Sequence, residues 1–397
     1  MNISALRYRD FRIYIIGNMF ALNGLWMQRV TLGWIAWELT SSAFYVGFVA
    51  FLNFAPTIFI GPLFGVLVDR IRVQKAALIT QSSMLVMAVM LFTSYSVGLL
   101  GIILLPILSG LSGIIAAGHH PVRMSLAPRL VERGDVASVV AFTAINFNLA
   151  RLTGPALGGW IIANWGVEQS MFVQILCHLP FILVISFLRP RQRSATNKPA
   201  KPFFRELRIG FQHVFQSEMI RQAVIITGIF AFIIRGTLEI LPVVADGVFD
   251  KGAIGLGLLT SSAGLGALLG GMTKAVLPGQ LSGRLPRLAL ISAIAGTGLV
   301  PLIGNSHSWH LTLLLIGCMG FTASIAAISM QTAVQVDLDD DLRGRVMSLW
   351  VMVGIGATAL GSIVLGILID QIGFAPALSW VGGLGLIFLI GQISRIW

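Results

Sequence analysis

The chain has 397 residues, of which 56% are hydrophobic and only 11% are charged. A soluble domain carries about 25% charged residues, so this composition excludes soluble classes of protein and indicates an integral membrane protein. The formal net charge of +11 is dispersed in short clusters between apolar runs, which favours anionic lipid headgroups over nucleic acid as the partner of these charges.

Twelve apolar runs are candidate membrane helices, because a membrane-crossing helix needs roughly 20 residues. The first run is too long for a signal peptide, so we expect a retained first span. Basic residues gather in every second connection, whereas the other connections hold a single one, Lys251. This positive-inside pattern predicts that both termini are cytoplasmic. The runs cover approximately residues 11–37, 44–68, 76–95, 97–119, 136–163, 170–188, 219–244, 252–274, 286–304, 309–334, 344–369 and 374–394.

The longest break between apolar runs, residues 189–218, divides six predicted spans from six. Its first half is rich in proline, serine and basic residues and is typical of a flexible linker. Its second half places Phe204, Leu207, Phe211 and Phe215 at helical spacing, which indicates an amphipathic helix on the inner membrane surface. The predicted domains are therefore an N-terminal bundle of residues 1–188, the linker of residues 189–218, and a C-terminal bundle of residues 219–397.

The two predicted bundles share a glycine pattern. Three glycines of the first half recur in the second half at a constant offset, namely Gly154, Gly159 and Gly166 with Gly361, Gly366 and Gly373. "RGDVAS" before the fifth span is also matched by "RGRVMS" at the start of the eleventh. The sequence therefore predicts an all-α membrane protein of twelve transmembrane helices in two pseudo-symmetric six-helix bundles.

The end of the second span, "GPLFGVLVDRIRVQKAAL", carries an aspartate four residues after a glycine, followed by basic residues. Gly65, Asp69, Arg70 and Lys75 resemble the inner-loop motif of the major facilitator superfamily, although Arg72 stands where that family usually has glycine. "DFRIYIIGNMF", "WMQRVTLGWIAWELTSSA" and "RGRVMSLWVMV" resemble the branch of the enterobactin exporter and drug-efflux proteins. "GPALGG" (residues 154–159) resembles the fifth-helix motif associated with antiporters.

The resemblance implies that Asp69 faces the N-terminus of the eleventh span near Gly344. A carboxylate at a helix N-terminus is stabilised by up to about 2 kcal/mol when partly buried. Gly65, one turn earlier, would allow close approach of the two backbones. The expected role of this motif is an inner gate; an ordinary loop charge is the alternative.

Four charged residues lie inside predicted spans and away from their ends: Arg29, Arg151, Arg235 and Glu239. A charge at mid-bilayer costs at least about 3 kcal/mol on insertion scales, so we expect Arg151 to face the interior of the bundle. It is either satisfied by backbone carbonyls or takes part in substrate or proton binding. The helix breakers that follow it indicate a thin, bendable face against a partner helix: Gly154, Pro155, Gly158 and Gly159.

Arg235 and Glu239 are four residues apart and therefore share one helix face. Glu239 is the acidic residue placed inside a span away from its end, which makes it the first candidate for a proton-coupling carboxylate. A permanent ion pair with Arg235 is the alternative. Many proton-driven relatives have an arginine in the fourth span, and "LLPILSGLSGIIAAG" has none.

The predicted function is secondary active export of a small amphiphilic molecule (a drug, siderophore or metabolite) by alternating access in exchange for protons. The alternatives are a lysophospholipid flippase of the same fold and a non-transporting sensor or assembly protein. No enzyme activity, cofactor or metal site is expected. The expected partners are the substrate, protons and membrane lipids. The expected form is a monomer in the bacterial inner membrane. The predicted cavity residues are Trp26, Gln28, Arg29, Asn146, Arg151, Arg235 and Glu239.

Overall fold

The computed structural model describes residues 4–68, 71–191, 203–277 and 284–394. These residues form helices and turns, with no strand among them. Ten of the helical segments are long and apolar enough to cross a membrane. Within the described ranges, α1 and α4 complete the twelve spans, although charged or histidine residues interrupt their apolar sequences. Both pack inside the first half: α1 lies along α5 and α6, and α4 lies along α2.

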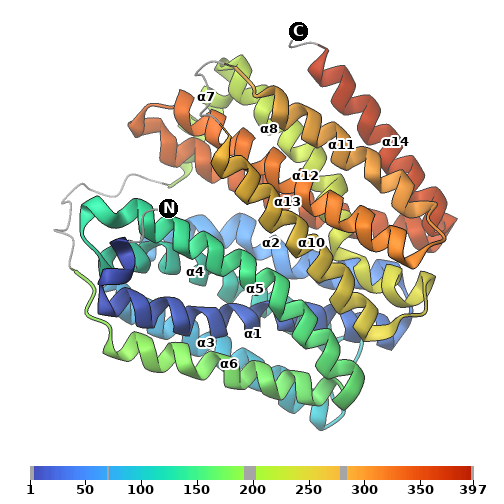
Figure 1. The fold of residues 1–397 in the computed structure, drawn as a ribbon, viewed down its shortest axis with the longest axis horizontal. Helices are drawn as coiled ribbons and strands as arrows, with labels where there is room; N and C mark the ends of the chain where they lie inside the picture. The colour runs from blue at the N-terminus through green and yellow to red at the C-terminus, as the bar shows by residue number, and fades with distance from the viewer. Residues whose placement is uncertain (1–3, 69–70, 192–202, 278–283, 395–397) are drawn as a thin grey trace.

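The first half of the chain supplies six of these spans and appears as the lower group of helices in Figure 1. Short 3-10 turns precede α1 (Ser4–Arg7) and follow α4 (Ala127–Leu130 and Arg133–Asp135). The six long helices are α1 (Arg9–Thr40), α2 (Ala43–Val68), α3 (Val73–Ser96), α4 (Leu104–Leu126), α5 (Val136–Trp165) and α6 (Val167–Phe187).

The second half forms the upper group of helices in Figure 1. Its first span is interrupted: α8 (Glu218–Phe230) runs into a π-helical turn, η4 (Ala231–Arg235), and then into α9 (Gly236–Glu239), with a second π-helical segment, η5 (Val243–Val248), before the next span. The other helices are α7 (Phe203–Gln216), α10 (Gly252–Val276), α11 (Arg287–Gly304), α12 (Trp309–Asp337), α13 (Asp340–Ile372) and α14 (Phe374–Ile393).

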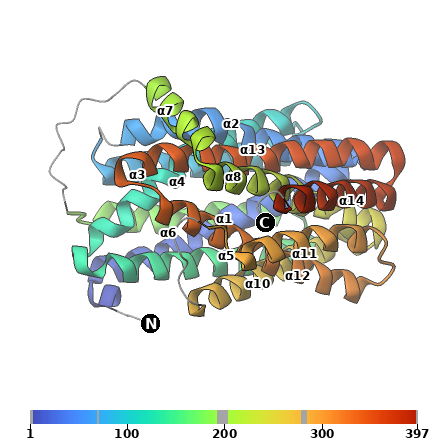
Figure 2. The same cartoon turned by 90° about the horizontal axis from the view of Figure 1, so that it is seen from above.

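The connection before α8 contains the expected amphipathic helix, α7. It lies at the periphery of the bundle in both views (Figures 1 and 2) and packs on the start of α13, where Gly210 meets the backbone of Arg345. Val214 is buried, whereas Phe211 and Phe215 stack on each other and remain about half exposed. The exposed rings are the side of α7 that is available to lipid.

The two halves share a hydrophobic core at only one end of the molecule. One cluster of buried side chains continues from the second half into the first, joining Leu241 and Val244 to Val30 and Ile35. A separate cluster around Phe11, Tyr14 and Phe181 belongs to the first half alone. We call the end with the shared core, which holds the Thr40–Ala43 turn, the closed end, and the opposite end, which holds the Arg133–Asp135 turn, the open end.

One predicted span was misplaced along the sequence. The fourth span was expected over residues 97–119, but α4 covers Leu104–Leu126. The residues after His119 were left outside the predicted span, and in the structure they form the last part of this helix. Pro121 is tolerated there because this part of the helix does not depend on lipid: His119 and Val122 are buried, and His120 and Arg123 line a cavity.

Candidate functional site

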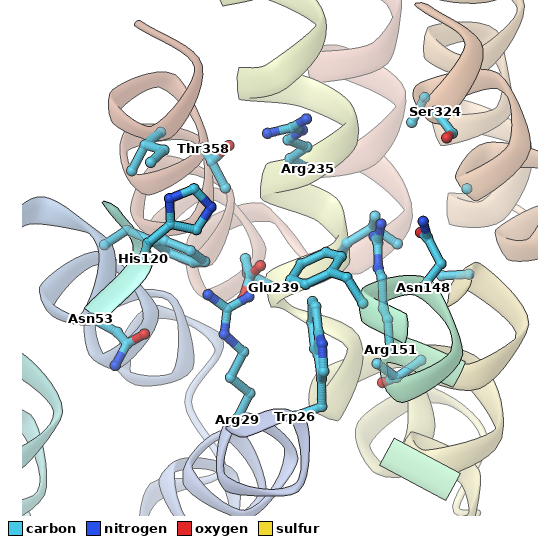
Figure 3. Close-up of a pocket in the computed structure, with 18 of the residues that line it drawn as sticks. Trp26, Arg29, Asn53, His120, Asn148, Arg151, Arg235, Glu239, Ser324 and Thr358 are labelled. Carbon is cyan, nitrogen blue, oxygen red and sulfur yellow. The ribbon is translucent and has the colours of Figure 1, made fainter. Parts of the chain in front are cut away.

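A cavity of about 750 Å³ lies between the two halves of the molecule (Figure 3). The first half lines it with α1, α2, α4 and α5, and the second half with η4, α9, α10, α12 and α13. Its volume is within the range of pockets that bind small molecules. The polar residues on its wall, apart from the charged ones, are Asn18, Asn53, Ser109, His120, Thr143, Asn148, Thr260, Ser324, Gln331 and Thr358.

The cavity extends towards the open end and stops before the closed end. Its lining includes Met124 in the last turn of α4, Pro128 just after this helix, and Val140 near the start of α5. On α5 the lining ends at Arg151; beyond this residue α5 is packed against α10. The structure is therefore a conformation in which a central cavity is accessible from one side only.

Glycines allow α5 and α10 to meet on the closed side of the cavity. A Cβ on Gly159 would lie 2.8 Å from the Cα of Gly257, and a Cβ on Gly257 would lie 2.9 Å from the carbonyl oxygen of Pro155. Ser261 adds a hydrogen bond to the Leu152 carbonyl oxygen at 2.9 Å. Gly154 and Gly158 instead face α1, against Trp26 and Met27. The breakers after Arg151 thus permit close packing on two neighbouring helices.

Asp370 ties the two halves together at the closed end. It lies near the end of α13, and its carboxylate accepts hydrogen bonds from Ser42 Oγ at 2.6 Å and from the backbone N–H groups of Ala43 at 2.8 Å and Phe44 at 3.0 Å. These groups are the start of α2, so the carboxylate caps a helix from the other half. Gly366, one turn earlier on α13, packs directly on the Ala43–Phe44 backbone.

A second hydrogen bond across the closed end joins Trp37 of α1 to Asp246 of η5, with Nε1 donating to Oδ2 at 2.8 Å. Neither this aspartate nor Asp370 was among the residues singled out in the sequence. A signal for Asp370 was available: "GILIDQI" (residues 366–372) has the same glycine–aspartate spacing as "GVLVDRI" (residues 65–71).

Four arginines and one glutamate line the cavity: Arg29, Arg123, Arg151, Arg235 and Glu239. The guanidinium carbon of Arg29 lies 4.8 Å from the ring centroids of both Trp26 and Phe54, and that of Arg151 lies 5.6 Å from the Trp26 centroid. Such positions over aromatic faces are attractive and hold the planar guanidinium groups in place.

Arg123 was assigned to an inner loop by the sequence, and the structure places it on α4 at the cavity wall. Its guanidinium carbon lies 5.6 Å from the ring centroid of Phe147, which in turn makes an edge contact with Trp26 at 5.7 Å. The displaced boundary of α4 is the reason why sequence reasoning missed this residue.

Arg235 and Glu239 both reach the cavity, but they do not form the alternative ion pair. Arg191 and Glu132, which lie outside the cavity, approach within 4.0 Å as an ion pair, whereas Arg235 and Glu239 do not. Arg235 is the last residue of the π-helical turn and Glu239 the last residue of the short α-helix that follows it. In Figure 3 the Arg235 side chain extends away from Glu239.

Two of the predicted cavity residues are placed elsewhere. Gln28 is buried and donates a hydrogen bond from Nε2 to Ser112 Oγ of α4 at 3.4 Å. Asn146 donates from Nδ2 to the Ile15 carbonyl oxygen of α1 at 2.6 Å. Both side chains join helices within the first half, and neither is part of the cavity wall. The sequence assigned both residues to the correct spans. It did not predict which way their side chains point, because that depends on how the helices pack.

Part of the predicted inner-gate motif lies outside the described residues, namely Asp69 and Arg70. Gly65 lies in the last turns of α2, Arg72 immediately precedes α3, and Lys75 is in the first turn of α3; both basic side chains are exposed at the open end. The gate role of this motif stays a prediction.

The profile of the transmembrane secretion effector family matches residues 2–395. The chain belongs to this family. Its relatives are transporters of the major facilitator superfamily, so this transmembrane secretion effector is a multi-pass membrane transporter and not an enzyme. The family resemblance inferred from the sequence is thereby confirmed.

Two curated relatives are similar to this transmembrane secretion effector over almost their whole length. The staphyloferrin A transporter of Staphylococcus aureus is 25% identical over 375 residues, which cover 93% of this chain and 92% of the relative. The enterobactin exporter EntS of Escherichia coli is 22% identical over 369 residues, which cover 92% of this chain and 87% of the relative.

Solved structures share the fold at low sequence identity. The nucleoside transporter NupG has a TM-score of 0.74 at 13% identity, with 97% of this chain and 98% of that chain covered. A bacterial homolog of the human lysosomal transporter Spinster, inward-facing and unoccupied, has a TM-score of 0.70 at 15% identity, with 98% and 96% covered. These likenesses concern the fold alone, and they confirm the predicted twelve-helix major facilitator architecture.

Proposed function

We propose that this chain is a secondary active exporter that moves a small amphiphilic molecule out of the cytoplasm by alternating access, in exchange for protons. It would act as a monomer in the bacterial inner membrane, with the open end and both termini cytoplasmic. The observation that carries the proposal is the cavity between the two halves, which is accessible from one end and blocked at the other. The similarity to a staphyloferrin A transporter and to an enterobactin exporter supports export of a molecule of this kind.

In this proposal the contacts at the closed end are the ones that must break when the cavity opens to the other side. Besides the shared hydrophobic core and the Trp37–Asp246 hydrogen bond, two sets of these contacts join the halves. Glycine-mediated contacts between α5 and α10 are apolar and can slide or part without leaving a buried charge. The Asp370 cap on α2 is polar and exposed, so water can replace its partners when the halves separate.

Glu239 is the proposed proton-binding group. It is the acidic residue among the described cavity-lining residues, and no cavity arginine forms an ion pair with it within 4.0 Å. Intramembrane carboxylates that face a cavity are typical of proton relays in transporters. Its position on α9, between the π-helical turn and the closed end, would place it where the access of water changes with conformation.

Transport by the purified protein in proteoliposomes would test the proposal. The panel contains a fluorescent dye, an antibiotic, a siderophore and a lysophospholipid, each measured with and without an imposed pH gradient. Gradient-dependent movement of a soluble amphiphile is the expected result. Movement of the lysophospholipid alone would replace the proposal by a flippase of the same fold, and movement of no compound under any gradient would contradict export.

The inner-gate motif gives a separate prediction. Asp69→Asn is expected to reduce transport at least tenfold with no loss of expression, because the variant loses the charge that would stabilise the helix N-terminus opposite it. Initial rates in proteoliposomes would measure the loss, with Asp10→Asn as a control at the same end of the molecule, near the start of α1. Wild-type rates from Asp69→Asn would remove the gate assignment.

A further inference from the structure

The charges on the cavity wall are strongly unbalanced. Four arginines face one carboxylate, Glu239, within the described lining. The arginines come from four different helical segments (α1, α4, α5 and η4), so their convergence is a property of the folded molecule and not of one basic stretch. Placing like charges in a region of low dielectric is unfavourable unless a counter-charge is present for part of the working cycle.

The protein itself supplies little of this counter-charge. In the part of the chain that the structure describes, no carboxylate forms an ion pair within 4.0 Å with a cavity arginine, and no hydrogen bond from their guanidinium groups to protein atoms is present. The close contacts of Arg29, Arg123 and Arg151 are with aromatic faces, those of Trp26, Phe54 and Phe147. The N–H donors of a guanidinium group point outward in the plane of that group. When the group lies over an aromatic ring, these donors remain free for an incoming acceptor.

Trp26 organises the centre of this arrangement. The guanidinium carbons of Arg29 and Arg151 both lie within 5.6 Å of its ring centroid, so they are less than twice that distance apart. Figure 3 shows them on either side of the ring. The Trp26 indole N–H is buried and has no hydrogen-bond partner. A ligand with two acidic groups joined by a flat apolar segment would fit this pattern of charges and rings.

We propose that the cargo of this transporter is an amphiphilic anion that carries at least two acidic groups on a planar apolar framework, held by Arg29 and Arg151 on either side of Trp26. This inference rests on the proposed export function and adds the chemical class of the substrate. Carboxylate or other acidic oxygens would accept hydrogen bonds from the two guanidinium groups, and the framework would lie against the neighbouring aromatic residues of the wall, Phe54 and Phe147.

Binding to a matched series of probes tests the charge preference directly. The full chain in nanodiscs is titrated calorimetrically with naphthalene-2,6-dicarboxylate, 2-naphthoate and 2-naphthylmethylammonium, which share one ring system and differ in charge. We expect the dianion to bind at least about tenfold more tightly than the monoanion, because hydrogen bonds to charged groups are the strong ones. The cation should show no measurable binding. Equal binding of the cation and the dianion would overturn the proposal.

Substitutions then locate the site. Arg29→Gln and Arg151→Gln are each expected to weaken binding of the dianion about tenfold or more. Arg151→Lys keeps the charge but loses the planar fork, so its affinity should lie between those of Arg151→Gln and the wild type. Arg189→Gln removes the same charge from an exposed position outside the cavity and should leave the affinity unchanged.

Glu239 provides a test with the opposite sign. Glu239→Gln removes the negative charge that competes with an anion for the arginines, so the dianion should bind more tightly to this variant than to the wild type. A proton on Glu239 would therefore not displace an anionic cargo. Exchange for protons would then depend on whether the protein changes conformation with the cargo bound or with the proton bound. It would not depend on competition between proton and cargo for binding in the cavity.

Three further results would contradict the anionic cargo: unchanged affinity of the dianion in both the Arg29→Gln and Arg151→Gln variants, weaker binding in Glu239→Gln, or tighter binding of lysophosphatidylglycerol than of the dianion. If a glutamine variant does not fold, as judged by size-exclusion chromatography, the preference of the wild-type protein among the three probes still decides. These are equilibrium measurements, so failure of transport in proteoliposomes would contradict the proposed export without affecting this result.

Discussion

Glu239→Gln is expected to abolish the dependence of export on a pH gradient, so that the rate with a gradient falls to the rate without one. Glutamine keeps the size and hydrogen-bonding capacity of the side chain but cannot take up or release a proton in the range of the gradient. Movement of cargo down its own concentration gradient should persist, because the cavity and its arginines are unchanged. Paired efflux measurements in proteoliposomes, with and without a pH difference, would show the effect.

The matched control for this experiment is Glu218→Gln. Glu218 begins α8, in the same span as Glu239, but it is exposed near the open end and is not part of the cavity wall. Its substitution should leave gradient dependence intact. If Glu239→Gln retains the full response to the gradient, then Glu239 is not the coupling group and another carboxylate must be sought.

Asp370→Asn should shift the conformational equilibrium away from the form described here and towards one that is open at the other end. The carboxylate caps the start of α2 with two backbone hydrogen bonds and one from Ser42, all of which join the two halves. Loss of a helix cap costs about 0.5–2 kcal/mol, and one to two kcal/mol changes an equilibrium by about 5- to 30-fold. Because Asp370 is exposed, we expect the lower part of this range.

Distances between spin labels would measure this shift. Labels on cysteines introduced at Ser186 and Thr273, both exposed near the open end, report the separation of the two halves once Cys177 and Cys318 are replaced by serine. The Asp370→Asn variant should show a larger population of short distances. Asp250→Asn removes the same charge from another exposed position near the closed end and serves as the control. Identical distance distributions in Asp370→Asn and the wild type would rule out a locking role for Asp370.

Asp69 and Asp370 can be compared because each is expected to contact the start of the other helix in the pair α2 and α13. Both follow a glycine by four residues; Asp370 lies near the end of α13, and in the sequence Asp69 comes directly after the last described residue of α2. The contact of Asp370 with the start of α2 is present in the structure, whereas the contact of Asp69 with the start of α13 is a prediction. If both hold, each aspartate would favour the conformation in which its own end is closed, and their asparagine variants would shift the equilibrium in opposite directions.

The sequence by itself determined the class of the protein, its twelve helices to within a few residues in most cases, and the fact that Arg29, Arg151, Arg235 and Glu239 do not face lipid. Each of these follows from the local cost of placing a residue in a bilayer, which depends on residue type and hardly on the rest of the chain. The glycines after Arg151 likewise indicated close helix packing before the partners were known.

Only the tertiary structure decided which interior residues share one space. It brought Arg29 and Arg151 to the same ring, left Arg235 and Glu239 without an ion pair, turned Gln28 and Asn146 to neighbouring helices, and joined Asp370 to a turn 328 residues away. Hydropathy says that a side chain must leave lipid, but not which helix it meets, because that depends on the rotation of each helix and on packing between segments distant in the sequence. The π-helical turn before α9 changed that rotation in a way that regular helical spacing does not predict.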